Sequence, residues 1–162
     1  MKKLWIGSIV LIVLIIISFI FYWQYTYLFR KLPKIISQDN EGVIGDRKIT
    51  GGFTISYKNS TYRASIINFA DKEEASRFFD TYLMDIVRTA DKNGIPTSSI
   101  SIKGFNGHRI IAPKSVYDQT EIEDHIGFLL LEDKNIVVCT CYTKIVEDAE
   151  YVCDWFIKEK FG

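Results

Sequence analysis

The chain has 162 residues, of which 48% are hydrophobic and 14% aromatic, with 20 basic and 20 acidic side chains. This composition can bury a core, which excludes a disordered chain, and 3 cysteines are too few for a disulfide-dense miniprotein. Five of the basic side chains fall in residues 1–34, so residues 35–162 hold 15 basic and 20 acidic side chains. That acidic surplus in the folded part excludes a basic arm that binds nucleic acid.

The first predicted element is a membrane helix. Residues 4–29 contain no charged side chain, and as a helix they would measure roughly 39 Å, longer than the bilayer core of about 30 Å. Aromatic residues flank the aliphatic run, at Trp5, Tyr22, Trp23, Tyr25 and Tyr27. A cleaved signal peptide is the alternative, but the run is longer than a usual signal and lacks a small-residue cleavage site. The pattern predicts a single-pass signal-anchor in residues 1–29, which contacts the lipid bilayer through residues 4–29.

A short juxtamembrane linker is predicted next, over residues 30–40, reaching at most about 36 Å when extended. Basic side chains lie on both sides of the predicted membrane helix, so the positive-inside count nearly ties. Three features favour a location of the C-terminal domain outside the cytoplasm: the aromatic belt, the short N-terminal tail and the glycosylation sequon that begins at Asn59. We therefore expect residues 41–162 to form an extracytoplasmic domain.

The domain is predicted to begin with a hairpin and a helix. Apolar residues alternate with polar ones over residues 53–57 and again over 62–69, which predicts two paired strands. Asp71 then has the position of a helix cap, with a glutamate three residues later. An apolar stripe follows from Ala75 to Ala90, and Asn93-Gly94 predicts the end of the helix.

Two more hairpins and a second helix follow, with strands over 98–105, 108–112, 125–131 and 136–143 and a helix over 146–161. Asn106-Gly107 predicts a type I′ turn in the second hairpin, and residues 113–124 a polar loop. The strands of the third hairpin are apolar on both faces and are expected at the centre of the sheet.

These elements together predict an α+β fold in the order ββα-ββββα. An N-terminal transmembrane helix precedes an antiparallel sheet of about six strands in three hairpins, with two helices on one face.

The acidic run before the third hairpin is a candidate metal site. Glu121, Glu123, Asp124 and His125 offer carboxylate and imidazole ligands for a divalent metal. The run lacks the spacing of an EF-hand or of a His-Glu-x-x-His helix, so a solvated loop is the alternative. No cofactor is predicted, because the chain contains no phosphate-binding loop, nucleophile elbow or zinc-ribbon spacing.

The three cysteines lie in the last strand and the last helix. Cys139 and Cys141 are two positions apart on a strand and share a face, while Cys153 lies on the helix face expected to pack on the sheet. A disulfide from Cys153 to Cys139 or to Cys141 is one interpretation, and three buried thiols are the other.

The leading functional hypothesis is a membrane-anchored, non-enzymatic domain that binds a protein partner or serves as an accessory subunit. One alternative is a metal-dependent enzyme that uses residues 118–125. A small-ligand sensor is another.

Overall fold

The computed structural model describes residues 14–22, 32–39, 42–44, 46–112, 115–117, 120–122 and 124–162, with only the backbone described at 115–117 and 120–122. The chain divides into two compact units, residues 1–32 and residues 33–162. The described residues 14–22 of the first unit are helical.

The structure corrects the prediction of an N-terminal transmembrane helix. Within the described ranges, no helix is both long enough and apolar enough to cross a membrane. The interpretation of residues 1–29 as a single-pass signal-anchor requires a spanning helix, so it is corrected for the same reason. Residues 4–13 and 23–29, on which the rest of that prediction falls, lie outside the described residues.

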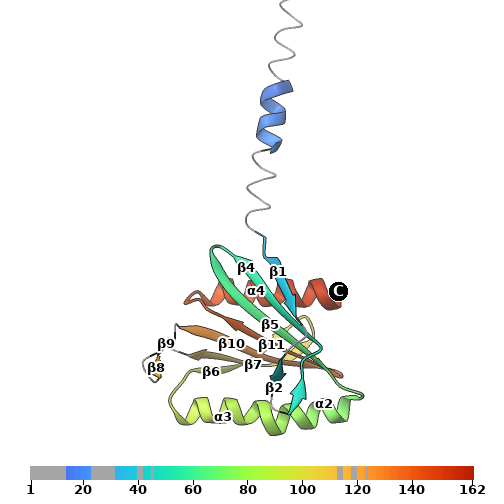
Figure 1. Ribbon diagram of the computed structural model, residues 1–162, viewed down its shortest axis with the longest axis vertical. Helices are drawn as coiled ribbons and strands as arrows, with labels where there is room; N and C mark the ends of the chain where they lie inside the picture. Colours follow the sequence, from blue (N-terminus) through green and yellow to red (C-terminus); the bar gives the residue numbers. More distant parts are fainter. Residues whose placement is uncertain are drawn as a thin grey trace, which may run out of the picture. The chain divides into compact units, whose positions relative to one another are not determined.

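Residues 33–162 form a seven-stranded antiparallel sheet with the order β1-β4-β5-β11-β10-β7-β6 (Figure 1). Its strands are β1 Lys34–Asp39, β4 Gly51–Tyr57, β5 Ser60–Asn68, β6 Thr97–Ile102, β7 Phe105–Ala112, β10 His125–Glu132 and β11 Asn135–Cys141. Two small two-stranded sheets pair β2 (Val43–Ile44) with β3 (Arg47–Lys48), and β8 (Ser115–Tyr117) with β9 (Thr120–Ile122).

Helices cover both faces of the large sheet. The first helical segment runs through α2 (Lys72–Phe78), the π-helical η1 (Phe79–Leu83) and α3 (Met84–Lys92) and packs on one face. Helix α4 (Val146–Phe161) packs on the other face. We call these the α2 side and the α4 side.

The prediction of about six strands with two helices on one face is therefore wrong. Along β11, Ile136 belongs to the α2-side core, whereas Val137 and Cys139 belong to the α4-side core. Because the central strands are apolar on both faces, each face needs a helix to keep its side chains from water. Residues 34–39, assigned from sequence to the linker, form the edge strand β1, and the predicted polar loop contains β8 and β9.

The turn of the second hairpin also differs from the predicted turn at Asn106-Gly107. The turn is Lys103-Gly104, where both residues have positive φ angles of 51° and 91°. Gly107 lies inside β7, and a Cβ atom there would stand 1.9 Å from the Leu129 carbonyl oxygen. The glycine therefore permits a close approach between strands.

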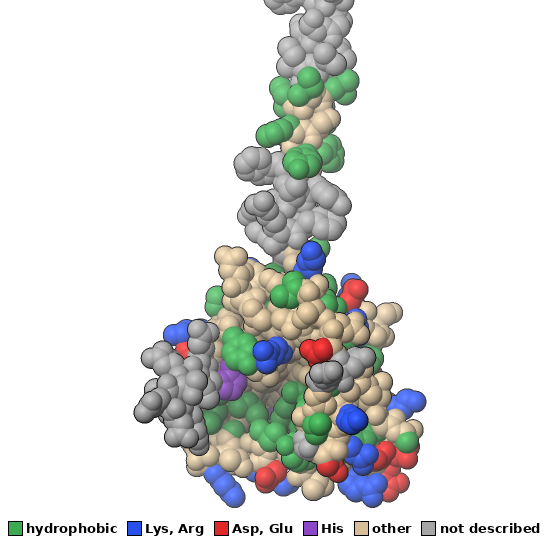
Figure 2. All heavy atoms as spheres, in the orientation of Figure 1, with side chains coloured by type: hydrophobic (Ala, Val, Ile, Leu, Met, Phe, Trp, Pro, Cys, Tyr) green, Lys and Arg blue, Asp and Glu red, His purple; other side chains and the backbone are tan. Residues whose placement is uncertain are grey.

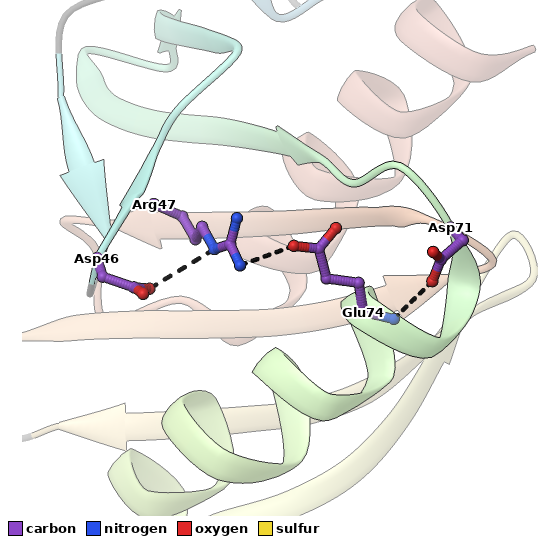
Figure 3. Close-up of polar contacts among 4 residues, drawn as sticks. All are labelled: Asp46, Arg47, Asp71 and Glu74. Atoms are coloured by element: carbon purple, nitrogen blue, oxygen red, sulfur yellow. Dashed lines mark hydrogen bonds and ion pairs between the residues drawn. The ribbon is translucent and has the colours of Figure 1, made fainter.

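The predicted helix signals are confirmed. Asp71 caps α2, its Oδ1 accepting a hydrogen bond of 2.8 Å from the Glu74 backbone N–H (Figure 3). The Glu74 carboxylate reaches in the other direction to Arg47 Nη2 at 2.7 Å, and so ties the β2–β3 hairpin to the start of α2. Gly94, with a φ angle of 70°, follows the end of α3.

Candidate functional site at the edge strand β6

Strand β6 forms one edge of the large sheet. The Ile111 N–H donates to the Pro96 carbonyl at 2.9 Å, so in the alternating antiparallel pattern Ser98, Ile100 and Ile102 also bond to β7. The N–H and C=O groups of the intervening residues, Thr97, Ser99 and Ser101, therefore point away from the sheet. Within the described part of the chain, no strand pairs with them.

The two edges of the sheet differ in their chemistry. Strand β1 carries the charged residues Lys34 and Asp39, and its register against β4 shifts between Ile35 and Ser37. Charges and bulges of this kind discourage a further strand from pairing. Strand β6 has the sequence Thr-Ser-Ser-Ile-Ser-Ile, without charge or proline, and an unbroken register with β7. The β6 edge therefore lacks these protective devices.

A hollow of about 910 Å³ lies beside β6 on the α2 side. We call it the α2-side hollow; it is lined by Lys72, Phe79, Asp80, Ser99, Ile100, Ser101, Gly104, Asn106, Gly107, His108, Leu131, Glu132 and Asp133. Phe79 and Asp80 belong to η1, where the Met84 N–H bonds to the Phe79 carbonyl five residues back. Such π-helical turns occur frequently at functional sites.

A second hollow of about 690 Å³ lies on the α4 side of the same strand. This α4-side hollow is lined by Ser98, Ser99, Ile100, Ser101, Ile102, Lys103, Arg109, Glu147, Glu150, Tyr151 and Asp154. Because Ser99, Ile100 and Ser101 line both hollows, β6 is the ridge between two depressions. Figure 2 shows one face of the molecule, with hydrophobic side chains around a depression in its surface.

Both ends of β6 are held in place. At its start, Thr97 Oγ1 donates a hydrogen bond to Asp91 Oδ1 at the end of α3. At its end, the Lys103 ammonium lies 3.8 Å from the Asp154 carboxylate of α4. On the α4 side of the strand, the Arg109 guanidinium pairs with Glu150. The Nε atom of Arg109 is buried and has no hydrogen-bond partner among the described atoms. The open edge is therefore positioned by both helical layers.

The predicted metal site is only partly described. Glu121 lies on β9, and nothing of its side chain or of Glu123 is described. Asp124 Oδ2 lies 3.0 Å from Lys144 Nζ, and His125 begins β10, opposite Ala112. Among the described residues, no group of three His, Cys, Asp or Glu side chains could hold a metal ion. The metal site stays a prediction.

The structure brings two of the three cysteines together. All three are buried free thiols; Cys153 Sγ on α4 lies 3.0 Å from Cys139 Sγ on β11, whereas no such contact joins Cys141 to Cys153 among the described residues. The hydrogen bond from Cys153, together with burial, raises the pKa of Cys139 well above its usual value, and burial raises the pKa of Cys141. Thiols held protonated in this way are poor nucleophiles. The geometry favours Cys139 as the partner of Cys153 in the predicted disulfide.

The predicted glycosylation residue Asn59 lies in the β4–β5 turn. It is exposed, with a φ angle of 64°, next to Lys58 at 46°. A glycan at this position and a location of the domain outside the cytoplasm stay predictions.

Comparisons of the chain with protein-family models, with curated proteins and with solved structures found no match.

The residues of the β6 site were not singled out from the sequence. The strand predicted over residues 98–105 overlaps β6 (Thr97–Ile102) but runs through the turn at Lys103-Gly104, and whether a strand lies at an edge depends on distant pairing. One local signal was present: this stretch is the uncharged, serine-rich strand of the second hairpin. From the sequence, Asp80 was predicted only as part of a helix and Glu132 and Asp133 only as part of a turn, because their approach to β6 is a tertiary feature.

Proposed function

We propose that residues 33–162 form a non-enzymatic protein-binding domain that takes an extended segment of a partner as an additional strand beside β6. The observation that carries the proposal is the open β6 edge between two hollows. In this mode of recognition, backbone hydrogen bonds supply affinity and pockets for alternate side chains supply specificity. The outward groups of Thr97, Ser99 and Ser101 would provide the bonds.

The fixed position of β6 supports this proposal. A strand that is already ordered loses little conformational entropy when a partner binds. The partner's side chains would point alternately to the two faces of the sheet, because successive residues of a strand project on opposite sides. Side chains on one face of the added strand would therefore enter the α2-side hollow, and those on the other face the α4-side hollow. The side chains of this domain leave both hollows unfilled.

A proline substitution tests the proposal. In Ser99→Pro, an outward N–H is lost while the hydrogen bonds from β6 to β7 are kept, because proline is tolerated at the open side of an edge strand. Ser99→Ala keeps the N–H and is the matched control. Peptides selected against the full chain from a random display library should bind Ser99→Ala like the original protein and lose affinity for Ser99→Pro. Equal binding to both variants by every selected peptide would contradict the proposal.

A further inference from the structure

We infer that the partner segment beside β6 alternates basic with apolar residues, with its lysine or arginine side chains entering the α2-side hollow. This inference rests on the proposed strand addition and assigns the chemistry of the partner. It follows from the different linings of the two hollows.

The register of the sheet decides which partner residues enter which hollow. Ser99 lies opposite His108 and Ser101 opposite Asn106, and these β7 residues lie opposite Leu129 and Leu131 of β10. Leu129 and Leu131 pack in the α2-side core. Residues directly opposite one another on paired strands project on the same face. Partner residues opposite Ser99 and Ser101 therefore project into the α2-side hollow.

The lining of the α2-side hollow combines apolar and acidic side chains. It includes the buried Phe79 and the partly buried Leu131. Its ionisable side chains are the three carboxylates of Asp80, Glu132 and Asp133, the amine of Lys72 and the imidazole of His108. Within the described residues, none of these three carboxylates lies in an ion pair.

Lysine and arginine match this lining better than other side chains. Their aliphatic stems can cover apolar surface while the charged heads stay at the edge. An acidic partner residue would instead meet like charge, which is unfavourable.

The α4-side hollow calls for a different side chain. Partner residues opposite Ile100 project to this face, where Ile100 is packed against the core and the Tyr151 ring is 40% exposed. Three carboxylates, of Glu147, Glu150 and Asp154, also line this hollow. Two of them are already paired with cations of the same lining, Glu150 with Arg109 and Asp154 with Lys103. An apolar partner residue would cover Ile100 and Tyr151 without breaking those ion pairs. Together the two faces specify an alternation of basic and apolar residues.

Three synthetic nine-residue peptides test the inference by fluorescence anisotropy with the full chain. The first alternates lysine with valine, the second alternates glutamate with valine, and the third has the composition of the first with all lysines placed before all valines. We expect the alternating lysine peptide to bind about tenfold more tightly than either of the others. The block peptide separates strand alternation from simple attraction between charges.

A matched pair of charge variants locates the binding. Glu132→Gln/Asp133→Asn removes two carboxylates at the hollow, and Asp85→Asn/Glu159→Gln removes two exposed carboxylates elsewhere. The first variant should weaken the alternating lysine peptide about three- to tenfold, and the second should change its affinity little.

The possible failures are distinguishable. If the alternating lysine and glutamate peptides bind equally, and Ser99→Pro weakens both, the inferred chemistry is wrong while strand addition stands. If neither binds while library-selected peptides still lose affinity for Ser99→Pro, the inferred chemistry is wrong and strand addition stands; if the selected peptides bind Ser99→Pro and Ser99→Ala equally, both are wrong. If lysine-peptide binding survives Ser99→Pro, the attraction is non-specific and the inference is overturned. A dimer of the free full chain that shields β6 would also overturn it, because a second copy would then be the occupant.

Discussion

Oxidation of Cys139 and Cys153 to a disulfide should stabilise the folded domain. Their Sγ atoms lie 3.0 Å apart, and a disulfide bond of about 2.05 Å needs a further approach of only about 1 Å. Glutathione disulfide is a suitable oxidant: the two thiols lose two protons and two electrons, and the oxidant leaves as two glutathione thiols. Cys141 stays as a free thiol.

The gain in stability follows from the length of the loop. The segment between the two cysteines closes a loop of about 15 residues, which in the chain-entropy model raises the free energy of unfolding by roughly 3 kcal/mol. For a domain of this size, that gain corresponds to an increase in Tm of roughly 10 °C. Both thiols are buried in the α4-side core, so oxidation should be slow in the folded protein and fast during refolding.

The assay compares the reduced and oxidised full chain by mass spectrometry and calorimetry. Oxidised protein should lose the mass of two hydrogen atoms, and peptide mapping should join Cys139 to Cys153. Cys141→Ala should keep both the bond and the increase in Tm, whereas Cys153→Ala should lose both. A bond that includes Cys141, or an oxidised protein with an unchanged Tm, would refute this reasoning.

Two further predictions concern close packing and pH. Gly107→Ala should lower the free energy of unfolding by about 3 kcal/mol, because its Cβ would stand 1.9 Å from the Leu129 carbonyl oxygen. Gly127→Ala, with no atom within 4 Å of its Cβ, should change stability by less than about 0.5 kcal/mol in the same urea titration; equal losses would contradict the packing argument. The raised pKa values of Cys139 and Cys141 keep both thiols protonated in the folded state above their ordinary value of 9.0, where the unfolded chain loses its protons. Stability should therefore fall as pH rises above 9.0, by up to roughly 1.4 kcal/mol per pH unit and thiol, and a Cys139→Ala/Cys141→Ala variant should show a shallower fall in urea unfolding. If the free energy of unfolding falls equally steeply with pH in the variant and in the original protein, the raised pKa values of Cys139 and Cys141 are contradicted.

Local signals were sufficient to predict much of the secondary structure. The Asp71 cap, Gly94 after α3 and the turn between β10 and β11 each depend on residues a few positions apart, and all lie where the sequence places them. The capping bond of Asp71 reaches only to Glu74. Interactions of such short range can be recognised without knowledge of the tertiary fold.

The turn of the second hairpin shows where local propensity fails. Asn-Gly is the more favourable turn pair, yet the chain turns at Lys103-Gly104. This turn makes Ile102 and Phe105 opposite neighbours, and both are buried in the α4-side core. Burial of a Phe side chain is worth roughly 2–3 kcal/mol, more than a difference in turn preference.

The edge position of β6 could also not be predicted from sequence patterns. Two strands that are consecutive in the chain pair readily, but the placement of β11 between β5 and β10 joins segments far apart in sequence. The same long-range pairing leaves β6 at the edge and brings Glu132 beside it. The candidate site therefore became visible only with the tertiary structure.

Amide hydrogen exchange along β6, followed by NMR on the full chain, tests the open edge most directly. In the free protein, the amides of Ser99 and Ser101 should exchange rapidly, while those of Ile100 and Ile102, bonded to β7, should be protected. Addition of the alternating lysine–valine peptide should slow exchange at Ser99 and Ser101. If those two amides are already protected in the free chain, or stay fast when the peptide is bound, β6 is not the edge at which a partner strand is added.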